Sequence, residues 1–390
     1  MTKVIVAGVD MVKFAKPGSQ KPYREMASTA IRGAVAEAGI DPSLIEQAYG
    51  SYIYGDSTCA QHALYDAFMT GIPVINVNNN CSSGSTAIFM ARQAVQSGAV
   101  DCALAFGFEE MQPGALGSNW DDRESPFENF LKVLEEKDYP EAPLALRCFG
   151  AAGHHYMEKY GASPDLFAKV AVKTRNHAAL NPMALFTSEI TVEDVMSAPV
   201  MYMDYLTRLM CCPPTCGAGA ALICSDAFAR RHGIESGVEI VGQAMATDTP
   251  ATWNDPINLV GADMTRRAAQ EVYEQTGIGV DDVDVVELHD CFTVNEVITY
   301  EGLGLCGEGE STAFVENGDN TYGGKFVVNP SGGLMSKGHP IGATGLAQCY
   351  ELVNQLRNNA GQRQVGGAKV ALQHNLGLGG AAVVTLYRRS

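Results

Sequence analysis

Two cysteines and two histidines stand at points where an apolar run gives way to glycine and small polar residues. Cys81 follows the apolar run 72–77 and precedes a helix-like segment over 86–95. A cysteine at such a strand-to-helix turn is held out of the sheet, and the helix N-terminus favours its thiolate and supplies backbone N–H donors. Cys81 is therefore a candidate nucleophile. Taken alone, it fits a buried structural cysteine equally well.

The other three residues occupy similar positions. His289 and Cys291 follow the short apolar strand 283–286, and His339 opens a glycine-punctuated helix that runs to about residue 356. Open α/β sheets keep their sites at the carboxyl ends of the strands. A thiol needs a base to become a nucleophile, and a second thiol can carry protons. Two thiols and two imidazoles on strand-end loops therefore predict a site for nucleophilic catalysis.

Strands that alternate with helices predict an α/β architecture around this site. The clearest segments are the strands 3–9 and 100–106 and the helix 23–38. Between about 112 and 200 the chain is richer in acidic, aromatic and proline residues, which indicates an inserted helical subdomain. We expect helices over 152–160 and 165–179 within it.

The stretch from Cys81 to Phe106 resembles the stretch from His339 to Gln373, because each runs from a polar turn through a helix into a buried strand. This repeat predicts two α/β halves, 1–235 and 236–390, related by a pseudo-twofold axis. Cys81 and His339 would then lie at corresponding turns that face each other.

Composition excludes several classes of function. The 390 residues are 46% hydrophobic and 18% charged, which allows a large core, and the net charge of −17 disfavours nucleic acid and anionic membranes as partners. We find no apolar run that would span a bilayer and no secretion signal. The eleven irregularly spaced cysteines indicate reduced thiols, and the final Arg-Arg-Ser is not a Ser-Lys-Leu peroxisomal address, so we expect a cytoplasmic protein. The cluster Cys211-Cys212-Pro-Pro-Thr-Cys216 lacks a second ligand pair at finger-like spacing, so we predict no metal site.

Four motifs, in order along almost the whole chain, resemble those of the thiolase family, and most closely the thiolase domain of sterol carrier protein X. They are Asn-Asn-Asn-Cys81-Ser-Ser-Gly, His289-Asp-Cys291-Phe, the segment 329–345 around His339, and His374-Asn-Leu-Gly-Leu-Gly-Gly. Ordinary thiolases have Asn-Glu-Ala-Phe at 289–292 and a cysteine at 374. The resemblance implies two pseudo-twofold-related βαβαβαββ halves in α-β-α-β-α layers with an inserted helical loop domain. It also implies that this chain corresponds to the thiolase domain alone, without a lipid-binding domain.

The resemblance further implies a 3-oxoacyl-CoA thiolase with coenzyme A as co-substrate and no bound cofactor. Cys81, activated by His339, would attack the 3-keto carbon and become acylated as an enolate leaves. His289 and His339 would hold the enolate oxygen, and Cys291 would move the protons. A second oxyanion hole would use the backbone N–H groups of Cys81 and of the loop around Leu376 and Gly377.

The resemblance also points to fatty or sterol side-chain substrates and to a homodimer or tetramer. Phe149, His154 and Met335 are candidate substrate contacts, although His154 also fits an ordinary helix histidine. One alternative function is a thiolase-superfamily retro-aldolase, which would not need the nucleophile and the thiol base. A decarboxylating ketoacyl synthase would have no need of Cys291. A CoA- or lipid-binding protein without activity would be expected to have lost at least one of the four residues.

Overall fold

The computed structural model describes residues 2–114, 117–118, 120, 122–235 and 237–389. Its main element is a ten-stranded sheet in the order β10-β9-β11-β12-β8-β1-β7-β4-β2-β3. The strands of the N-terminal half are β1 (Val4–Met11), β2 (Gln47–Ser51), β3 (Val74–Val77), β4 (Cys102–Glu109) and β7 (Gly217–Ser225). Those of the C-terminal half are β8 (Val238–Ala246), β9 (Val285–Glu287), β10 (Val327–Val328), β11 (Val370–Gly377) and β12 (Ala381–Arg389).

The two halves repeat one topology. β2 runs parallel to β3 and β4, and β7 is antiparallel to both β4 and β1. In the same way, β9 runs parallel to β10 and β11, and β12 is antiparallel to both β11 and β8. The halves join where Ile5 of β1 pairs with Glu239 of β8. The expected pair of pseudo-twofold-related halves is thus confirmed, whereas the exact boundary between residues 235 and 236 stays a prediction.

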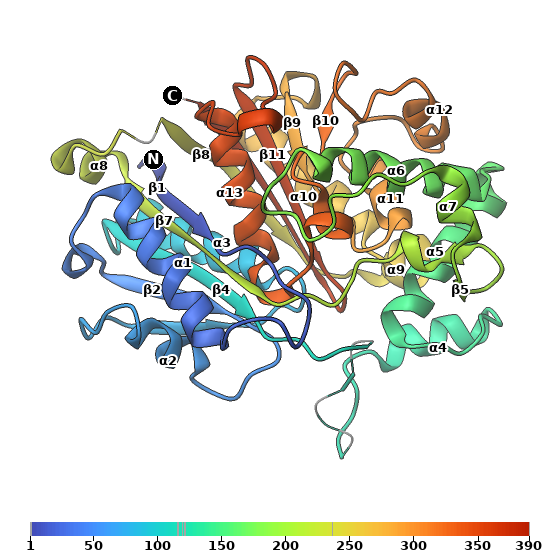
Figure 1. Cartoon of the computed structure of the whole chain (residues 1–390), viewed down its shortest axis with the longest axis horizontal. Coiled ribbons are helices and arrows are strands. Elements are labelled where there is room, and N and C mark those ends of the chain that lie inside the picture. Colours follow the sequence, from blue (N-terminus) through green and yellow to red (C-terminus); the bar gives the residue numbers. More distant parts are fainter. Residues whose placement is uncertain (1, 115–116, 119, 121, 236, 390) are drawn as a thin grey trace.

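Helices form the other layers (Figure 1). The central helices α3 (Ser83–Gln96) and α13 (Thr344–Leu356) contact each other and strands of both halves, while α1 (Tyr23–Ala38) packs on β1 and β7. On the opposite side α10 (Ala262–Thr276) packs on β8 and β12, and α11 (Thr293–Gly302) packs on α10. β4 shows why the layers form, because Leu104 and Phe106 face the α1 side and the small Ala103 and Ala105 face α3.

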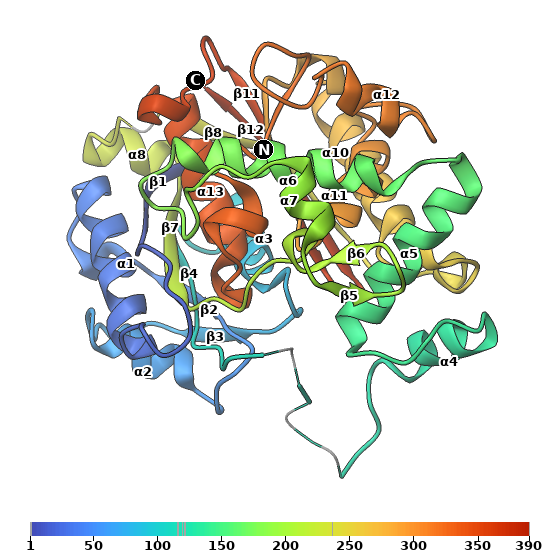
Figure 2. The same cartoon turned by 45° about the vertical axis from the view of Figure 1, so that its right-hand side comes forward.

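The expected helical insertion lies between β4 and β7. It contains α4 (Glu128–Glu136), α5 (Leu144–Tyr160), α6 (Pro164–Ala179), α7 (Val192–Ser197) and the hairpin of β5 (Val200–Tyr202) and β6 (Leu206–Thr207). Although it belongs to the N-terminal half in sequence, α5 and α6 pack on α11 of the C-terminal half (Figure 2). The insertion therefore covers the part of the chain that carries His289 and Cys291.

Four shorter helices complete the described fold: α2 (Cys59–Tyr65), α8 (Asp226–His232), α9 (Pro256–Leu259) and α12 (Ser311–Glu316). A π-helical turn, η5, spans Gly333–Lys337 just before His339. Across the described ranges, no helix is both long and apolar enough to cross a bilayer.

Candidate active site

Cys81 lies in the turn between β3 and α3, as the sequence predicts. Asn80, before it, adopts a left-handed conformation with φ of 51° and donates its side-chain N–H to the carbonyl oxygen of Leu378 at 2.9 Å. The end of β11, which belongs to the C-terminal half, packs against this turn. A Cβ on Gly377 would lie 2.1 Å from the carbonyl oxygen of Asn79, so glycine is required there. The two halves are thus in close contact beside Cys81.

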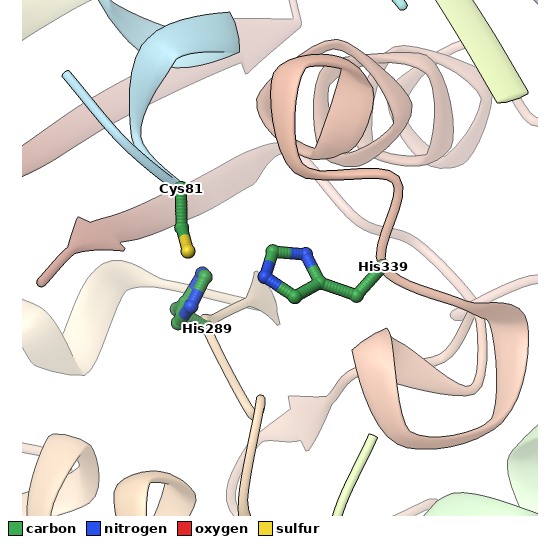
Figure 3. Close-up of side chains that lie close together, drawn as sticks. All are labelled: Cys81, His289 and His339. Carbon is green, nitrogen blue, oxygen red and sulfur yellow. The ribbon is translucent and has the colours of Figure 1, made fainter. Parts of the chain in front are cut away.

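The two central helices bring the second half of the site to Cys81. Their N-termini approach so closely that a Cβ on Gly345 would lie 2.3 Å from the backbone nitrogen of Ser85. This contact places His339, which precedes α13, opposite Cys81. One ligating atom each of Cys81, His289 and His339 lie within 4.8 Å of one another, and all three side chains are buried. Figure 3 shows a ring nitrogen of each histidine directed at the cysteine.

Hydrogen bonds fix the tautomer of His339. Its Nδ1 lies 2.6 Å from the hydroxyl oxygen of Thr344, whose own proton is donated to the carbonyl oxygen of Pro340 at 3.0 Å. The hydroxyl must therefore accept from Nδ1–H, and Nε2 keeps a lone pair. Nε2 is buried and has no hydrogen-bond partner in the described part of the chain. Burial lowers the pKa of His339 to about 3, so the imidazole is neutral.

The thiol is also neutral in the absence of substrate. Burial, with the nearby charge of Glu109, raises the pKa of Cys81 to about 12. Hydrogen bonds from the backbone N–H groups of Cys81 and Leu378 act in the opposite direction by favouring the thiolate. A neutral thiol facing a neutral imidazole is suited to transfer its proton as it attacks.

The last strand turn brings the backbone of Leu378, next to the predicted Leu376 and Gly377, close to Cys81. Leu376 and Gly377 belong to the ladder between β11 and β12, where they pair with Ala382 and Ala381. The next residue, Leu378, leaves the ladder, and its backbone acts to lower the pKa of the Cys81 thiol. The oxyanion roles of Leu376 and Gly377 stay predictions.

Cys291 lies at the edge of this cluster. It is 5% exposed, and burial together with the neighbouring Cys212 and Cys81 raises its thiol pKa well above the usual range. Cys212 donates its backbone N–H to the carbonyl oxygen of Cys291 at 2.9 Å. The sequence did not predict Cys212 at the site, because a loop cysteine beside two prolines carries no periodic signal.

Models of known protein families now identify the chain. The model of the thiolase N-terminal domain matches residues 4–208, and the thiolase C-terminal domain-like model matches residues 244–388. The chain belongs to the thiolase family. It is 53% identical over 395 residues to sterol carrier protein 2 of Rattus norvegicus, covering all of this chain and 72% of that relative. The resemblance expected from the motifs is confirmed.

Other proteins similar to this thiolase carry different names. The chain is 33% identical over 403 residues to the acetyl-CoA acetyltransferase of Methanothermobacter thermautotrophicus, and the match covers the whole of both chains. Among solved structures, the Ltp2-ChsH2(DUF35) aldolase superposes with a TM-score of 0.84 at 23% identity, covering 99% of this chain and 98% of that one. At this identity, the superposition shows a shared fold.

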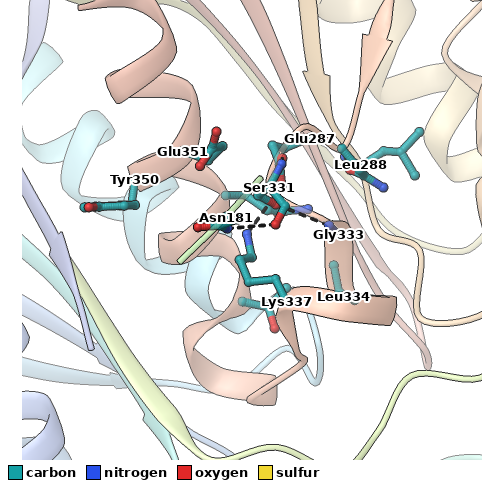
Figure 4. Close-up of polar contacts among 12 residues, drawn as sticks. Asn181, Glu287, Leu288, Ser331, Gly333, Leu334, Lys337, Tyr350 and Glu351 are labelled. Carbon is teal, nitrogen blue, oxygen red and sulfur yellow. Dashed lines mark hydrogen bonds and ion pairs between the residues drawn. The ribbon is translucent and has the colours of Figure 1, made fainter. Parts of the chain in front are cut away.

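A buried ion pair holds the His339 segment of this thiolase against β9 (Figure 4). Glu287, at the end of β9, accepts the backbone N–H and the hydroxyl of Ser331 at 3.0 and 2.8 Å, and its carboxylate lies 3.4 Å from Nζ of Lys337. The side chain of Asn181 from the insertion donates to the carbonyl oxygen of Ser331 at 2.8 Å. These contacts fix the register between the His289 loop and the His339 loop.

Asp290 ties the same two loops together as an uncharged acid. Its carboxyl group accepts the backbone N–H of Leu334 at 2.7 Å, at the start of the π-helical turn. Burial, with the negative charge of Glu296, raises the pKa of Asp290 to about 8. The folded protein therefore holds a proton on Asp290 at neutral pH that the unfolded chain releases above its usual pKa of 3.8.

We expect Asp290→Asn to weaken the pH dependence of stability. Because the native pKa is raised, the contribution of Asp290 to the free energy of unfolding is full below pH 4 and falls by about 1.4 kcal/mol per pH unit up to pH 8. Urea unfolding of wild type and variant at pH 5, 6 and 7 measures the difference in slope. The exposed Asp281, paired with Lys325 at 2.8 Å, supplies the control Asp281→Asn. Equal slopes for wild type and Asp290→Asn would contradict this assignment.

Glu109 is another buried acid that the sequence did not single out. Its carboxylate accepts backbone N–H groups of Ile53, Tyr54 and Gly342 at 2.9 to 3.1 Å. Burial raises the pKa of Glu109 to about 7 despite these bonds. It joins the Cys81 half to the His339 loop. The sequence feature that could have identified Glu109 is an acidic residue at the end of a fully buried strand.

The three candidate substrate contacts differ in their surroundings. Phe149 on α5 is buried and stacks on Phe292, beside Cys291, with ring centroids 4.8 Å apart. Met335 is buried in the π-helical turn, and its backbone N–H points to Asp290 at 3.5 Å. His154 is half-buried and faces Glu158 one helical turn away. Substrate contact by each of these residues stays a prediction.

Proposed function

We propose that this thiolase cleaves 3-oxoacyl-CoA with free coenzyme A through an acyl-enzyme on Cys81. The observation that carries the proposal is the compact cluster of Cys81, His289 and His339, with the unpartnered Nε2 of His339 facing a neutral thiol. This arrangement supplies a nucleophile, its base and a second imidazole in a buried site. Cys291, next to the cluster, supplies a further proton carrier.

In the first half-reaction, Nε2 of His339 takes the thiol proton as the sulfur of Cys81 attacks the 3-keto carbon. We assign the stabilisation of the developing oxyanion to the backbone N–H groups of Cys81 and of the strand-end segment 376–378. The C2–C3 bond then breaks, and its electron pair forms the enolate of acetyl-CoA or propionyl-CoA. The shortened acyl group, with the 3-keto carbon as its carbonyl carbon, remains on Cys81 as a thioester. Cys291 protonates the enolate carbon.

In the second half-reaction, the Cys291 thiolate takes the proton of the incoming coenzyme A thiol. The new thiolate attacks the thioester on Cys81, and the acyl group leaves as acyl-CoA. The Cys81 thiolate recovers its proton from His339, which restores the starting state. Two half-reactions that share one covalent intermediate predict ping-pong kinetics.

We infer coenzyme A as the co-substrate, with no resident cofactor, and fatty or sterol side-chain 3-oxoacyl-CoA as the substrate class. The name of the rat relative, sterol carrier protein 2, and that of the archaeal acetyl-CoA acetyltransferase support these two assignments. The assay follows the CoA-dependent loss of 3-oxoacyl absorbance with acetoacetyl-CoA and with a 2-methyl-3-oxoacyl-CoA. If the enzyme cleaved neither compound, the proposal would be contradicted.

A retro-aldolase or a silent CoA-binding protein predicts a different outcome of that assay. Neither of these functions needs an acylated Cys81. The similarity to the aldolase structure is a similarity of fold alone. A retro-aldolase needs a base but neither the Cys81 nucleophile nor the Cys291 thiol, and a silent binding protein needs none of the three groups. We therefore favour thiolysis.

We propose that the protein forms a homodimer, or a tetramer built from it, through β3. This strand is one of the two edge strands of the sheet, and its Ile75 and Asn76 are not buried. Unpaired edge strands readily pair with a second copy. Light scattering should give at least twice 41.5 kDa for the wild type and a smaller assembly for Ile75→Glu. Met196→Glu, a charge on an exposed apolar residue of the insertion, is the control. A monomeric wild type would contradict the proposal.

The reaction requires Cys81 and Cys291 as free thiols, and both are unpaired in the structure. We therefore place the protein in the cytoplasm, where thiols stay reduced. Fractionation of the source cells tests this placement.

A further inference from the structure

A buried chain of hydrogen bonds leads from β12 to His289. The hydroxyl of Tyr387 donates to Oε1 of Gln373 at 2.6 Å, and Nε2 of Gln373 donates to the hydroxyl oxygen of Ser85 at 2.9 Å. The Ser85 hydroxyl lies 2.9 Å from Oδ1 of Asn375, and Nδ2 of Asn375 lies 2.9 Å from Nδ1 of His289. Each of these side chains is at most 1% exposed, so water does not compete for the bonds.

The direction of this chain is set by a backbone carbonyl group. The carbonyl oxygen of Gly345 can only accept, and it lies 2.6 Å from the terminal amide of Gln373, which must therefore present its NH₂ group there. The same NH₂ group donates to Ser85, so the single hydroxyl proton of Ser85 is free to go to Asn375. If the amide of Asn375 were flipped, the Ser85 proton would lose this acceptor.

Asn375 consequently turns its oxygen to Ser85 and its NH₂ group to His289. A ring nitrogen that accepts a hydrogen bond carries no proton. In the neutral imidazole of His289 the proton must then be on Nε2. Burial and the neighbouring His339 and His374 lower the pKa of His289 well below its usual range, so the ring is neutral.

We propose that Asn375 is a positioning residue that holds His289 in the Nε2-protonated form, as a hydrogen-bond donor toward the reacting oxygen. Thr344 holds His339 in the opposite tautomer, with a bare Nε2. The two histidines that face Cys81 thus have different tasks: His339 removes the thiol proton, and His289 donates to the thioester oxygen on which the enolate charge develops. The second task rests on the proposed function, whereas the tautomer of His289 does not.

The same orientation of the Asn375 amide disfavours metal binding at the cluster of Cys81, His289 and His339. A thiolate and two imidazoles are a ligand set that zinc favours, and the three atoms here lie within 4.8 Å of one another. His289 can ligate through Nε2 only if its proton moves to Nδ1, where the NH₂ group of Asn375 points. A carboxylate at residue 375 would accept a proton on Nδ1, as carboxylates do behind metal-bound histidines. Asn375 therefore keeps the nucleophile free of metal.

The tautomer can be measured directly in the wild-type protein. In the full chain labelled with ¹⁵N-histidine, long-range ¹H–¹⁵N correlations distinguish a protonated Nδ1 from a protonated Nε2. The signals of His289 and His339 are assigned by their loss in His289→Gln and His339→Gln. We expect protonated Nε2 for His289 and protonated Nδ1 for His339. A protonated Nδ1 on His289 would overturn the proposal.

Metal binding supplies an independent readout. Anaerobic titration with Co²⁺ is followed by the thiolate-to-cobalt charge-transfer absorbance of the wild type, of Asn375→Asp and of Asn375→Asp combined with Cys81→Ser. We expect Asn375→Asp to bind Co²⁺ about 10- to 100-fold more tightly than the wild type, and the double variant to lose the band. Equal affinity of wild type and a folded Asn375→Asp would contradict the role of Asn375. If Asn375→Asp does not fold, the tautomer measurement on the wild type decides.

Steady-state kinetics separate positioning from general disruption. For Asn375→Leu, which cannot donate, we expect kcat of thiolysis to fall about 10²- to 10³-fold, the effect of losing an oxyanion donor, with KM almost unchanged. An unchanged kcat in a folded variant would overturn the catalytic part of the proposal. If the wild type itself showed no thiolysis, the proposed function would fail while the tautomer and cobalt results would still test Asn375.

Discussion

Cys81→Ala is expected to lower kcat of thiolysis by about 10⁴-fold or more, because loss of a covalent nucleophile removes both half-reactions. The side chain is buried at the turn between β3 and α3, and its replacement removes the sulfur and the hydrogen bond that the thiol donates to Oδ1 of Asn80 at 3.5 Å. Steady-state assays with acetoacetyl-CoA and free CoA measure the effect.

The matched control for Cys81 is Cys59→Ser, a half-buried cysteine at the start of α2. We expect this variant to keep near wild-type kcat. Retention of more than about one-hundredth of wild-type kcat by Cys81→Ala would mean that the sulfur of Cys81 does not form the covalent intermediate.

Cys291→Ala is expected to lower kcat by about 10²- to 10⁴-fold, which is the usual contribution of a positioned acid or base. Unlike the loss of Cys81, this change should leave acyl transfer from acetyl-CoA to the enzyme measurable, because that step breaks no carbon–carbon bond and forms no enolate. Rapid-quench detection of the acetyl-enzyme distinguishes the two variants.

Cys306→Ser serves as the control for Cys291, since Cys306 is half-buried and contacts Ser311 at 3.6 Å in the loop after α11. We expect it to turn over like the wild type. A Cys291→Ala enzyme with wild-type thiolysis would show that another group moves the protons, and Cys212, whose thiol neighbours Cys291, would be the next residue to test.

Local patterns predicted the elements that carry the site. The helix expected over 23–38 matches α1 (Tyr23–Ala38), where Gly39 ends it with φ of 67°. The strand-to-helix order around Cys81 and the repeat of that order around His339 predicted two facing turns, and the structure places the two residues in one cluster. Periodicity and punctuation are properties of short segments, so they can be found without contacts.

Residues that act across the two halves could not be predicted in this way. Asn375 and Ser85 are 290 positions apart, and their hydrogen bond depends on how α3 lies against β11. Leu378 could not be singled out beside Leu376 and Gly377, because only the register of β11 with β12 determines which N–H leaves the ladder. Glu109 likewise gains its role from Gly342, 233 positions away. Three consecutive polar residues, 373–375, in a buried strand were the one local sign of this network.

The most direct test of the central claim is intact-protein mass spectrometry after mixing the enzyme with acetoacetyl-CoA. Thiolysis through Cys81 predicts one added acetyl group on the wild type, its location on Cys81 by peptide mapping, its discharge on addition of free CoA, and no adduct on Cys81→Ser under the same conditions. A wild-type enzyme that consumes the 3-oxoacyl-CoA without any acyl adduct, or with an adduct on another residue, would contradict the claim.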